Sequence, residues 1–98
     1  MSDTADAPTA RKKPDKPIFF IGSSLRDLRA FPVDVKRVLG FAFRQAQQGG
    51  THADAKALKG YGGGSVLEVI ADHNSDTFRG VYTVRFRRAV YVLHAFQK

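Results

Sequence analysis

Three strand-like runs near the C-terminus decide the fold: VLEVIA (66–71), FRGVYTVRF (78–86) and AVYVLHAFQK (89–98). In each run apolar side chains alternate with polar or charged ones, which is the period of a β-strand. A cluster of turn-forming residues at 72–76 separates the first two runs. The pattern predicts three antiparallel strands with short connections.

Successive side chains of a strand point to opposite faces. We therefore expect the side chains of Arg79, Thr83 and Arg85 to lie on one face of the second run. Those of His94, Phe96 and Lys98 should likewise lie on one face of the third. A small sheet that carries cations and an imidazole on otherwise apolar strands suits phosphate chemistry better than a purely structural role.

The preceding residues predict a short strand and two helices. Pro17–Ile21 is expected to form an edge strand, and Leu25–Ala30 a short helix with Ser24 as its N-cap. A second helix is expected to begin at Pro32 and to end at Gly49-Gly50, because one side of it carries an apolar stripe at helical spacing: Val35, Val38, Leu39, Ala42 and Ala46.

The expected architecture is α+β: an N-terminal strand, a helical hairpin over one face, and then a three-stranded antiparallel sheet. Residues 53–58 are expected to form one helical turn at most, and the glycine-rich segment 60–65 a loop. We expect one domain over residues 17–98, preceded by a flexible basic arm at 1–16.

The positive charge belongs to the predicted domain rather than to the arm. The chain of 98 residues has a net charge of +7; residues 1–17 contain four Lys or Arg and three Asp, which leaves twelve Lys or Arg and six acidic residues in 18–98, a net +6. An RNA, DNA or ribosomal partner is the natural inference, with an acidic protein next.

Composition excludes several classes of site. The sequence contains no Cys, which rules out disulfides and thiolate metal sites and suits a cytoplasmic protein. No apolar run approaches the roughly 20 residues that span a bilayer, and the N-terminal residues lack the apolar region of a signal peptide. His52, His73 and His94 are far apart in sequence with no metal-binding spacing, so we expect neither a metal nor another cofactor.

The order and spacing of short motifs resemble the RelE/ParE toxin superfamily, in particular its HigB-like, phage-derived branch. The resemblance covers roughly residues 17–98 and rests on these segments: Ile18–Ser24, Leu58-Lys59-Gly60, Gly62–Gly64, Leu67-Glu68, Phe78-Arg79, Val81-Tyr82 and Leu93–Lys98. Relatives usually continue past the last strand into more lysines and a C-terminal helix, whereas this sequence ends at Lys98.

The resemblance implies a type II toxin–antitoxin toxin that cuts mRNA within the translating ribosome, with a small helix-turn-helix antitoxin as its partner. It implies a functional arginine at Arg79. Metal-independent RNA cleavage needs a base, an acid and cations at the phosphate. His94 is a candidate acid or base, Lys98 a second cation, and Glu68 a residue that orients Arg79 or merely pairs with it.

RNA binding is expected from residues around this site. The candidates are Lys59, Arg85, Arg87 and Arg88 for phosphates, and Tyr91 and Phe96 for stacking on bases. Two other functions fit the same residues. One is a non-catalytic poison of DNA gyrase like ParE, and the other is a degenerate toxin that survives as an antitoxin-binding or nucleic-acid-binding protein.

Overall fold

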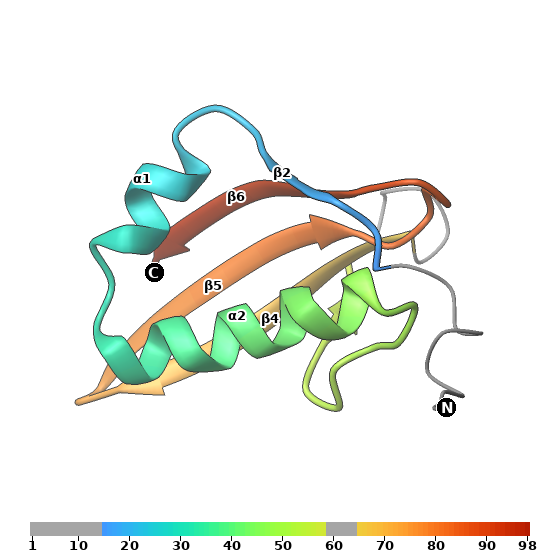
Figure 1. Ribbon diagram of the computed structural model, residues 1–98. Helices are drawn as coiled ribbons and strands as arrows, with labels where there is room; N and C mark the ends of the chain where they lie inside the picture. Colours follow the sequence, from blue (N-terminus) through green and yellow to red (C-terminus); the bar gives the residue numbers. More distant parts are fainter. Residues whose placement is uncertain (1–14, 59–64) are drawn as a thin grey trace, which may run out of the picture.

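In the described residues, two helices cover one face of a five-stranded mixed sheet (Figure 1). The computed structural model describes residues 15–58 and 65–98, so most of the predicted arm, and Lys59 with most of the glycine-rich segment, lie outside the described residues. The elements in chain order are β2 (Ile18–Phe20), α1 (Ser24–Arg29), α2 (Val33–Gln47), β3 (Lys56–Ala57), β4 (Val66–His73), β5 (Asp76–Thr83) and β6 (Val90–Gln97). Their order across the sheet is β2-β6-β5-β4-β3.

The predicted antiparallel strands are confirmed, but the sheet is not a three-stranded antiparallel one. β4, β5 and β6 pair antiparallel as expected, whereas β2 pairs parallel to β6 at one edge. At the other edge β3 pairs antiparallel with β4, where one helical turn was expected. The strand β2 was predicted, but its parallel pairing depends on β6, which lies near the other end of the chain. The strand β3 was missed because two residues are too few to show a period.

The two helices are formed close to their predicted positions but do not make a hairpin. α1 lies against β6, while α2 lies mainly against β4, so the helices diverge along the sheet (Figure 1). The cap of α1 is Ser23 rather than Ser24, and the Ser23 hydroxyl donates to the Asp27 carboxylate at 2.7 Å. Ser24 is buried instead, because its hydroxyl donates to the Val92 carbonyl of β6 at 3.2 Å.

The core lies between α2 and the sheet. The buried side chains of α2 are Val35, Leu39, Ala42, Phe43 and Ala46, so the predicted stripe is confirmed except that Val38 is only partly buried. They pack on Leu67, Val69, Phe78 and Tyr82. Phe43 lies directly over Gly80, where a Cβ atom would stand 3.0 Å from the Phe43 ring. Glycine at this position therefore allows helix and sheet to approach closely.

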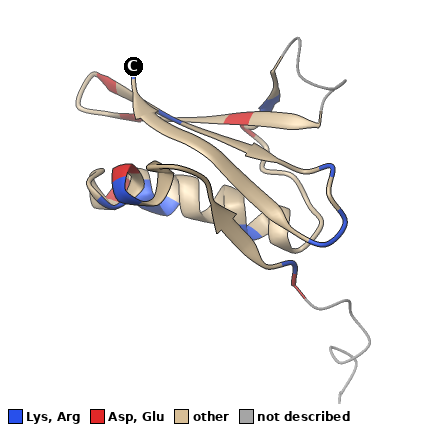
Figure 2. Cartoon of the chain, turned by 90° about the horizontal axis from the view of Figure 1, so that it is seen from above, with Lys and Arg blue, Asp and Glu red and all other residues tan. Residues whose placement is uncertain are grey.

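The opposite face of the sheet is not covered by either helix, and we call it the open face (Figure 2). Because side chains alternate along each strand, the neighbours of the buried core residues point to it. On β4 and β5 these include Glu68, Ile70, Arg79, Val81 and Thr83. Of the helices in the described ranges, neither reaches the length and hydropathy of a membrane-spanning segment.

A β-bulge in β6 changes which of its side chains reach the open face. Val81 pairs with His94, but the next residue, Tyr82, pairs with Val92, so Leu93 is an extra residue. Strict alternation would put Tyr91 and His94 on opposite faces. With the bulge, Val92 and Ala95 are both buried, and Tyr91 shares the open face with His94 and Phe96.

Candidate functional site

Arg79 and Glu68 form a partly buried ion pair at the centre of the open face. Arg79 Nη1 donates to Glu68 Oε1 at 2.9 Å, with 22% of the arginine side chain and 13% of the glutamate side chain exposed. The two residues are diagonal neighbours, since Arg79 is paired with Ile70 and Glu68 with Val81. A guanidinium held by a carboxylate in this way is fixed in position on the sheet.

The pair leaves part of the hydrogen-bonding capacity of Arg79 unused. A guanidinium has five N–H donors, and Nε of Arg79 is buried without a partner in the part of the chain that the structure describes. An unsatisfied buried donor is unfavourable by about 1–3 kcal/mol. The local arrangement is therefore not optimised for stability alone.

His94 and Phe96 lie beside Arg79 on the adjacent strand. Phe96 is paired with Arg79 and His94 with Val81, and the two rings are in contact at a centroid distance of 4.7 Å. His94 is exposed, and its ring nitrogens have no hydrogen-bond partner within residues 15–58 and 65–98. It is not the hydrogen-bonded core histidine that a lone imidazole on a sheet often is.

Lys98 follows directly after β6 on the side of Arg79. Its backbone N–H donates to the Thr77 carbonyl at 2.8 Å, which extends the pairing of β5 with β6 by one position. Thr77 and Arg79 share a face of β5, and the side chain of Lys98 is exposed. Arg79, His94, Phe96 and Lys98 are thus brought to one region of the open face.

Tyr91 and Arg85 belong to a second region of the same face, nearer the start of β6. Tyr91 stacks on Phe19 of β2 at a centroid distance of 5.7 Å and meets the edge of Phe86 at 5.3 Å. The guanidinium carbon of Arg85 lies 5.7 Å from the centre of the Phe86 ring. This region is separate from Arg79, because Phe96, the partner of Arg79, lies well beyond Tyr91 along β6.

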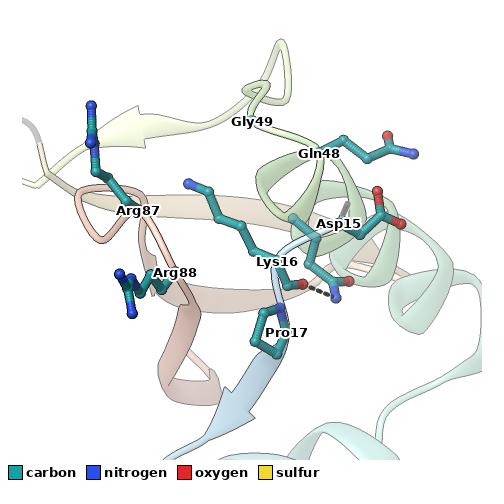
Figure 3. Close-up of a pocket in the computed structure, with 8 residues that line it drawn as sticks. Asp15, Lys16, Pro17, Gln48, Gly49, Arg87 and Arg88 are labelled. Atoms are coloured by element: carbon teal, nitrogen blue, oxygen red, sulfur yellow. Dashed lines mark hydrogen bonds between the residues drawn. The ribbon is translucent and has the colours of Figure 1, made fainter. Parts of the chain in front are cut away.

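Arg87 and Arg88 line an open hollow of about 810 Å³ at the end of the sheet (Figure 3). The hollow lies between the β5–β6 connection, the residues before β2 and the end of α2, and Lys16 extends into it toward the two arginines. Lys16 is held in place, since its Nζ donates to the Phe86 carbonyl at 3.1 Å and its backbone exchanges hydrogen bonds with Gln47. The β5–β6 connection, which carries several blue residues in Figure 2, therefore contributes Arg87 and Arg88 to the hollow and Arg85 to the second region.

Two titratable groups with shifted pKa values lie away from the open face. Burial raises the pKa of Tyr82, on the covered face, to about 12. A hydrogen bond from His73 lowers the pKa of Asp34, which lies 2.6 Å from the His73 ring nitrogen and joins the start of α2 to the β4–β5 turn. Neither group faces Arg79. No cluster of three or more His, Cys, Asp or Glu side chains suited to a metal occurs in the described ranges.

Three residues of the open face were not singled out from the sequence. Phe19 and Phe86 complete the aromatic contacts of Tyr91, and Lys56 of β3 is paired with Glu68. The alternation within Ile18-Phe19-Phe20 could have suggested that Phe19 faces away from the core. The parallel pairing of β2 with β6, which puts Phe19 beside Tyr91, has no local signal.

The fold and the open face together define a small basic α+β domain. Helices cover one side of its mixed sheet, and charged and aromatic groups occupy the other. Residues 26–98 match the family described as phage derived protein Gp49-like (DUF891), and the chain belongs to this family. It is a HigB-like toxin family of the RelE/ParE superfamily, as the motifs suggested. No match was found among curated proteins, and none among solved structures.

Proposed function

We propose that this protein is the toxin of a type II toxin–antitoxin pair and that it cleaves mRNA on the ribosome without a metal ion. Membership of a HigB-like family supports the role of toxin. The single observation that carries the proposed activity is the Arg79–Glu68 pair on the open face, next to the exposed His94 and to Phe96.

In the proposed reaction the ribose 2′-oxygen attacks the adjacent phosphorus. A bond forms between the 2′-oxygen and phosphorus, and the bond from phosphorus to the 5′-oxygen breaks. The proton of the 2′-hydroxyl passes to a base, and the leaving 5′-oxygen receives a proton from an acid, which gives a 2′,3′-cyclic phosphate and a 5′-hydroxyl. His94 serves as acid or base, since an imidazole changes its protonation near neutral pH.

Arg79 stabilises the charge that develops on the phosphate in this step. A guanidinium stays protonated and binds phosphate oxygens in a forked geometry. Glu68 holds it in place before the substrate arrives, which reduces the reorganisation needed during the reaction. Lys98 adds a second cation from the end of β6, and Phe96 supplies an apolar ring on which a base can stack.

The remaining basic residues are proposed to bind RNA rather than to take part in the chemistry. Arg85, Arg87 and Arg88 are exposed on the β5–β6 connection, where they suit phosphates of mRNA or ribosomal RNA. Lys59 is proposed for a flanking phosphate on the sequence resemblance alone. The helix-turn-helix antitoxin is likewise proposed as the partner that the family implies.

A non-catalytic role is the second candidate, and one observation favours it. Only 22% of the Arg79 side chain is exposed, and its carboxylate partner is close enough to make the pair a structural element. In that case the chain would act as a gyrase poison or survive as an antitoxin-binding protein.

The two candidates differ in what stops first in cells and in what is cut in vitro. Pulse labelling after induction should show that methionine incorporation falls before thymidine incorporation, and the reverse order would favour the gyrase poison. Purified protein should leave naked mRNA largely intact and cut it on programmed ribosomes, because a small site depends on the ribosome to position its substrate. A protein that cuts free RNA equally well would contradict the ribosome-dependent mechanism.

A further inference from the structure

On the open face, the ring of Tyr91 contacts two exposed phenylalanine rings, Phe19 and Phe86. Phe19 and Phe86 are 49% and 44% exposed, and both contact Tyr91, which is partly exposed. Large apolar side chains that are exposed as a group contribute little to the core and often mark a binding surface. We call these three residues the aromatic cluster.

Backbone hydrogen bonding holds two residues of the aromatic cluster, Phe19 and Tyr91, in place. Phe19 and Tyr91 are paired residues of β2 and β6, and the backbone N–H of Tyr91 donates to the buried hydroxyl of Thr83 at 3.1 Å. The bulge at Leu93 turns Tyr91 to the open face. Rings that are fixed before a ligand binds lose little conformational freedom on binding.

We propose that the aromatic cluster is a stacking surface for unpaired bases of single-stranded RNA, an inference that rests on the proposed function and adds a substrate-binding region to it. The positive charge around the aromatic cluster favours RNA over an apolar protein segment as its ligand. Arg85 lies over Phe86, and Arg87 and Arg88 follow in the same connection, so the rings are flanked by cations that suit a phosphate backbone.

The position of the aromatic cluster assigns it to nucleotides beside the cleaved bond rather than to the bond itself. Tyr91 and Phe96, the partner of Arg79, lie on one strand with the bulge at Leu93 between them, which leaves a separation of about 13 Å given the rise of a β-strand. Both side chains are on the open face. An RNA strand with a phosphate at Arg79 can therefore continue over the rings, which predicts an effect on binding more than on the rate of cleavage.

Binding of two oligonucleotides separates stacking from charge. The first probe is a fluorescein-labelled, single-stranded 2′-O-methyl oligoribonucleotide, which cannot be cleaved, and the second is an abasic oligomer of equal length and charge. Phe19→Ala and Phe86→Ala should each weaken binding of the first probe about fivefold or more, at fixed salt, and leave binding of the abasic probe unchanged. Phe41→Ala is the matched control, since Phe41 is 59% exposed but lies on α2.

A folding control keeps the result interpretable. Thermal melts identify any alanine variant that is unfolded, and Phe19→Leu then replaces Phe19→Ala, because leucine keeps most of the apolar volume and removes the ring. If both phenylalanine variants bind both probes as the parent does, or if the parent binds both probes equally, the stacking surface is wrong. Loss of antitoxin binding with unchanged RNA binding would also overturn it, because the cluster would then be a protein interface.

Cleavage on programmed ribosomes distinguishes failure of this inference from failure of the proposed function. If the parent protein prefers the base-bearing probe, the phenylalanine variants lose this preference, and the parent never cleaves mRNA, then the stacking surface is supported and the proposed nuclease activity is wrong. If the parent protein cleaves mRNA, and the protein concentration that gives half-maximal cleavage is unchanged in Phe19→Ala and Phe86→Ala, then the nuclease activity is supported and the stacking surface is wrong.

Discussion

Glu68 and Arg79 lie on neighbouring strands, and their 2.9 Å contact joins β4 to β5 on the face that neither α1 nor α2 covers. Both side chains are mostly removed from water, so neither charge is well solvated without the other. Glu68→Gln should therefore lower the free energy of unfolding by about 1–3 kcal/mol, which urea denaturation can measure.

An exposed ion pair provides the control for this prediction. Asp15 and Arg44 are also 2.9 Å apart but are 38% and 57% exposed, so Asp15→Asn should lower the free energy of unfolding by at most about 1 kcal/mol. Equal effects of the two substitutions would show that burial does not strengthen the Glu68–Arg79 pair.

His94→Gln tests whether the imidazole transfers a proton. Glutamine keeps a polar side chain of similar size but cannot act as acid or base near neutral pH, so the rate of cleavage on ribosomes should fall about 100- to 10,000-fold. Because His94 is exposed and its ring has no hydrogen-bond partner in the described residues, the melting temperature should hardly change. A parental cleavage rate in the folded variant would remove His94 from the reaction.

Tyr82→Phe should leave stability at neutral pH unchanged or slightly raised. The Tyr82 hydroxyl is buried and has no hydrogen-bond partner among residues 15–58 and 65–98, so its removal relieves a buried polar group. Urea denaturation at pH 7 measures this. A loss above about 1 kcal/mol would indicate that the hydroxyl is bonded in solution.

The same residue predicts how stability depends on alkaline pH. The pKa of Tyr82 is raised to about 12 in the folded chain, above the value of about 10 in an unfolded one. The resulting stabilisation is fully present below pH 10 and is lost as the pH rises from 10 toward 12. Tyr82→Phe should remove this part of the alkaline loss, whereas Tyr91→Phe, which leaves the buried phenol in place, should not.

Gly80→Ala tests the close approach of α2 to the sheet. The added Cβ would lie 3.0 Å from the Phe43 ring, so the helix or the ring must shift, and we expect a loss of about 1–3 kcal/mol in the free energy of unfolding. Phe43→Leu in the same chain should recover part of that loss, because it removes the opposing ring atoms. Additive effects in the double variant would contradict the predicted contact.

Local sequence patterns predicted those helices and strands whose side chains follow a regular period. Alternation located β4, β5 and β6 within a few residues, and the apolar stripe located α2, because each of these elements is long enough to show a period. The cap of α1 was placed one residue late, since both Ser23 and Ser24 suit a cap and only the contact of Ser24 with β6 decides between them.

The positions of the site residues were harder to predict than the helices and strands, because they depend on how distant segments of the chain pair. Arg79, Phe96 and His94 were predicted for neighbouring strands and do lie together. The sequence could not show that a bulge at Leu93 would turn Tyr91 to the same face, because the bulge depends on how β6 matches β5. Phe19 was missed for a similar reason, since its position follows from the parallel pairing of β2 with β6.

The most direct test of the proposed activity is single-turnover cleavage of mRNA on programmed ribosomes by Arg79→Ala. Arg26→Ala is the matched control, because it removes a guanidinium that is 84% exposed on α1. If Arg79 stabilises the transition state, Arg79→Ala should cleave about 100- to 1000-fold more slowly while it stays folded and binds its antitoxin, and Arg26→Ala should cleave at the parental rate. A folded Arg79→Ala protein that cleaves as fast as the parent would contradict the proposed site.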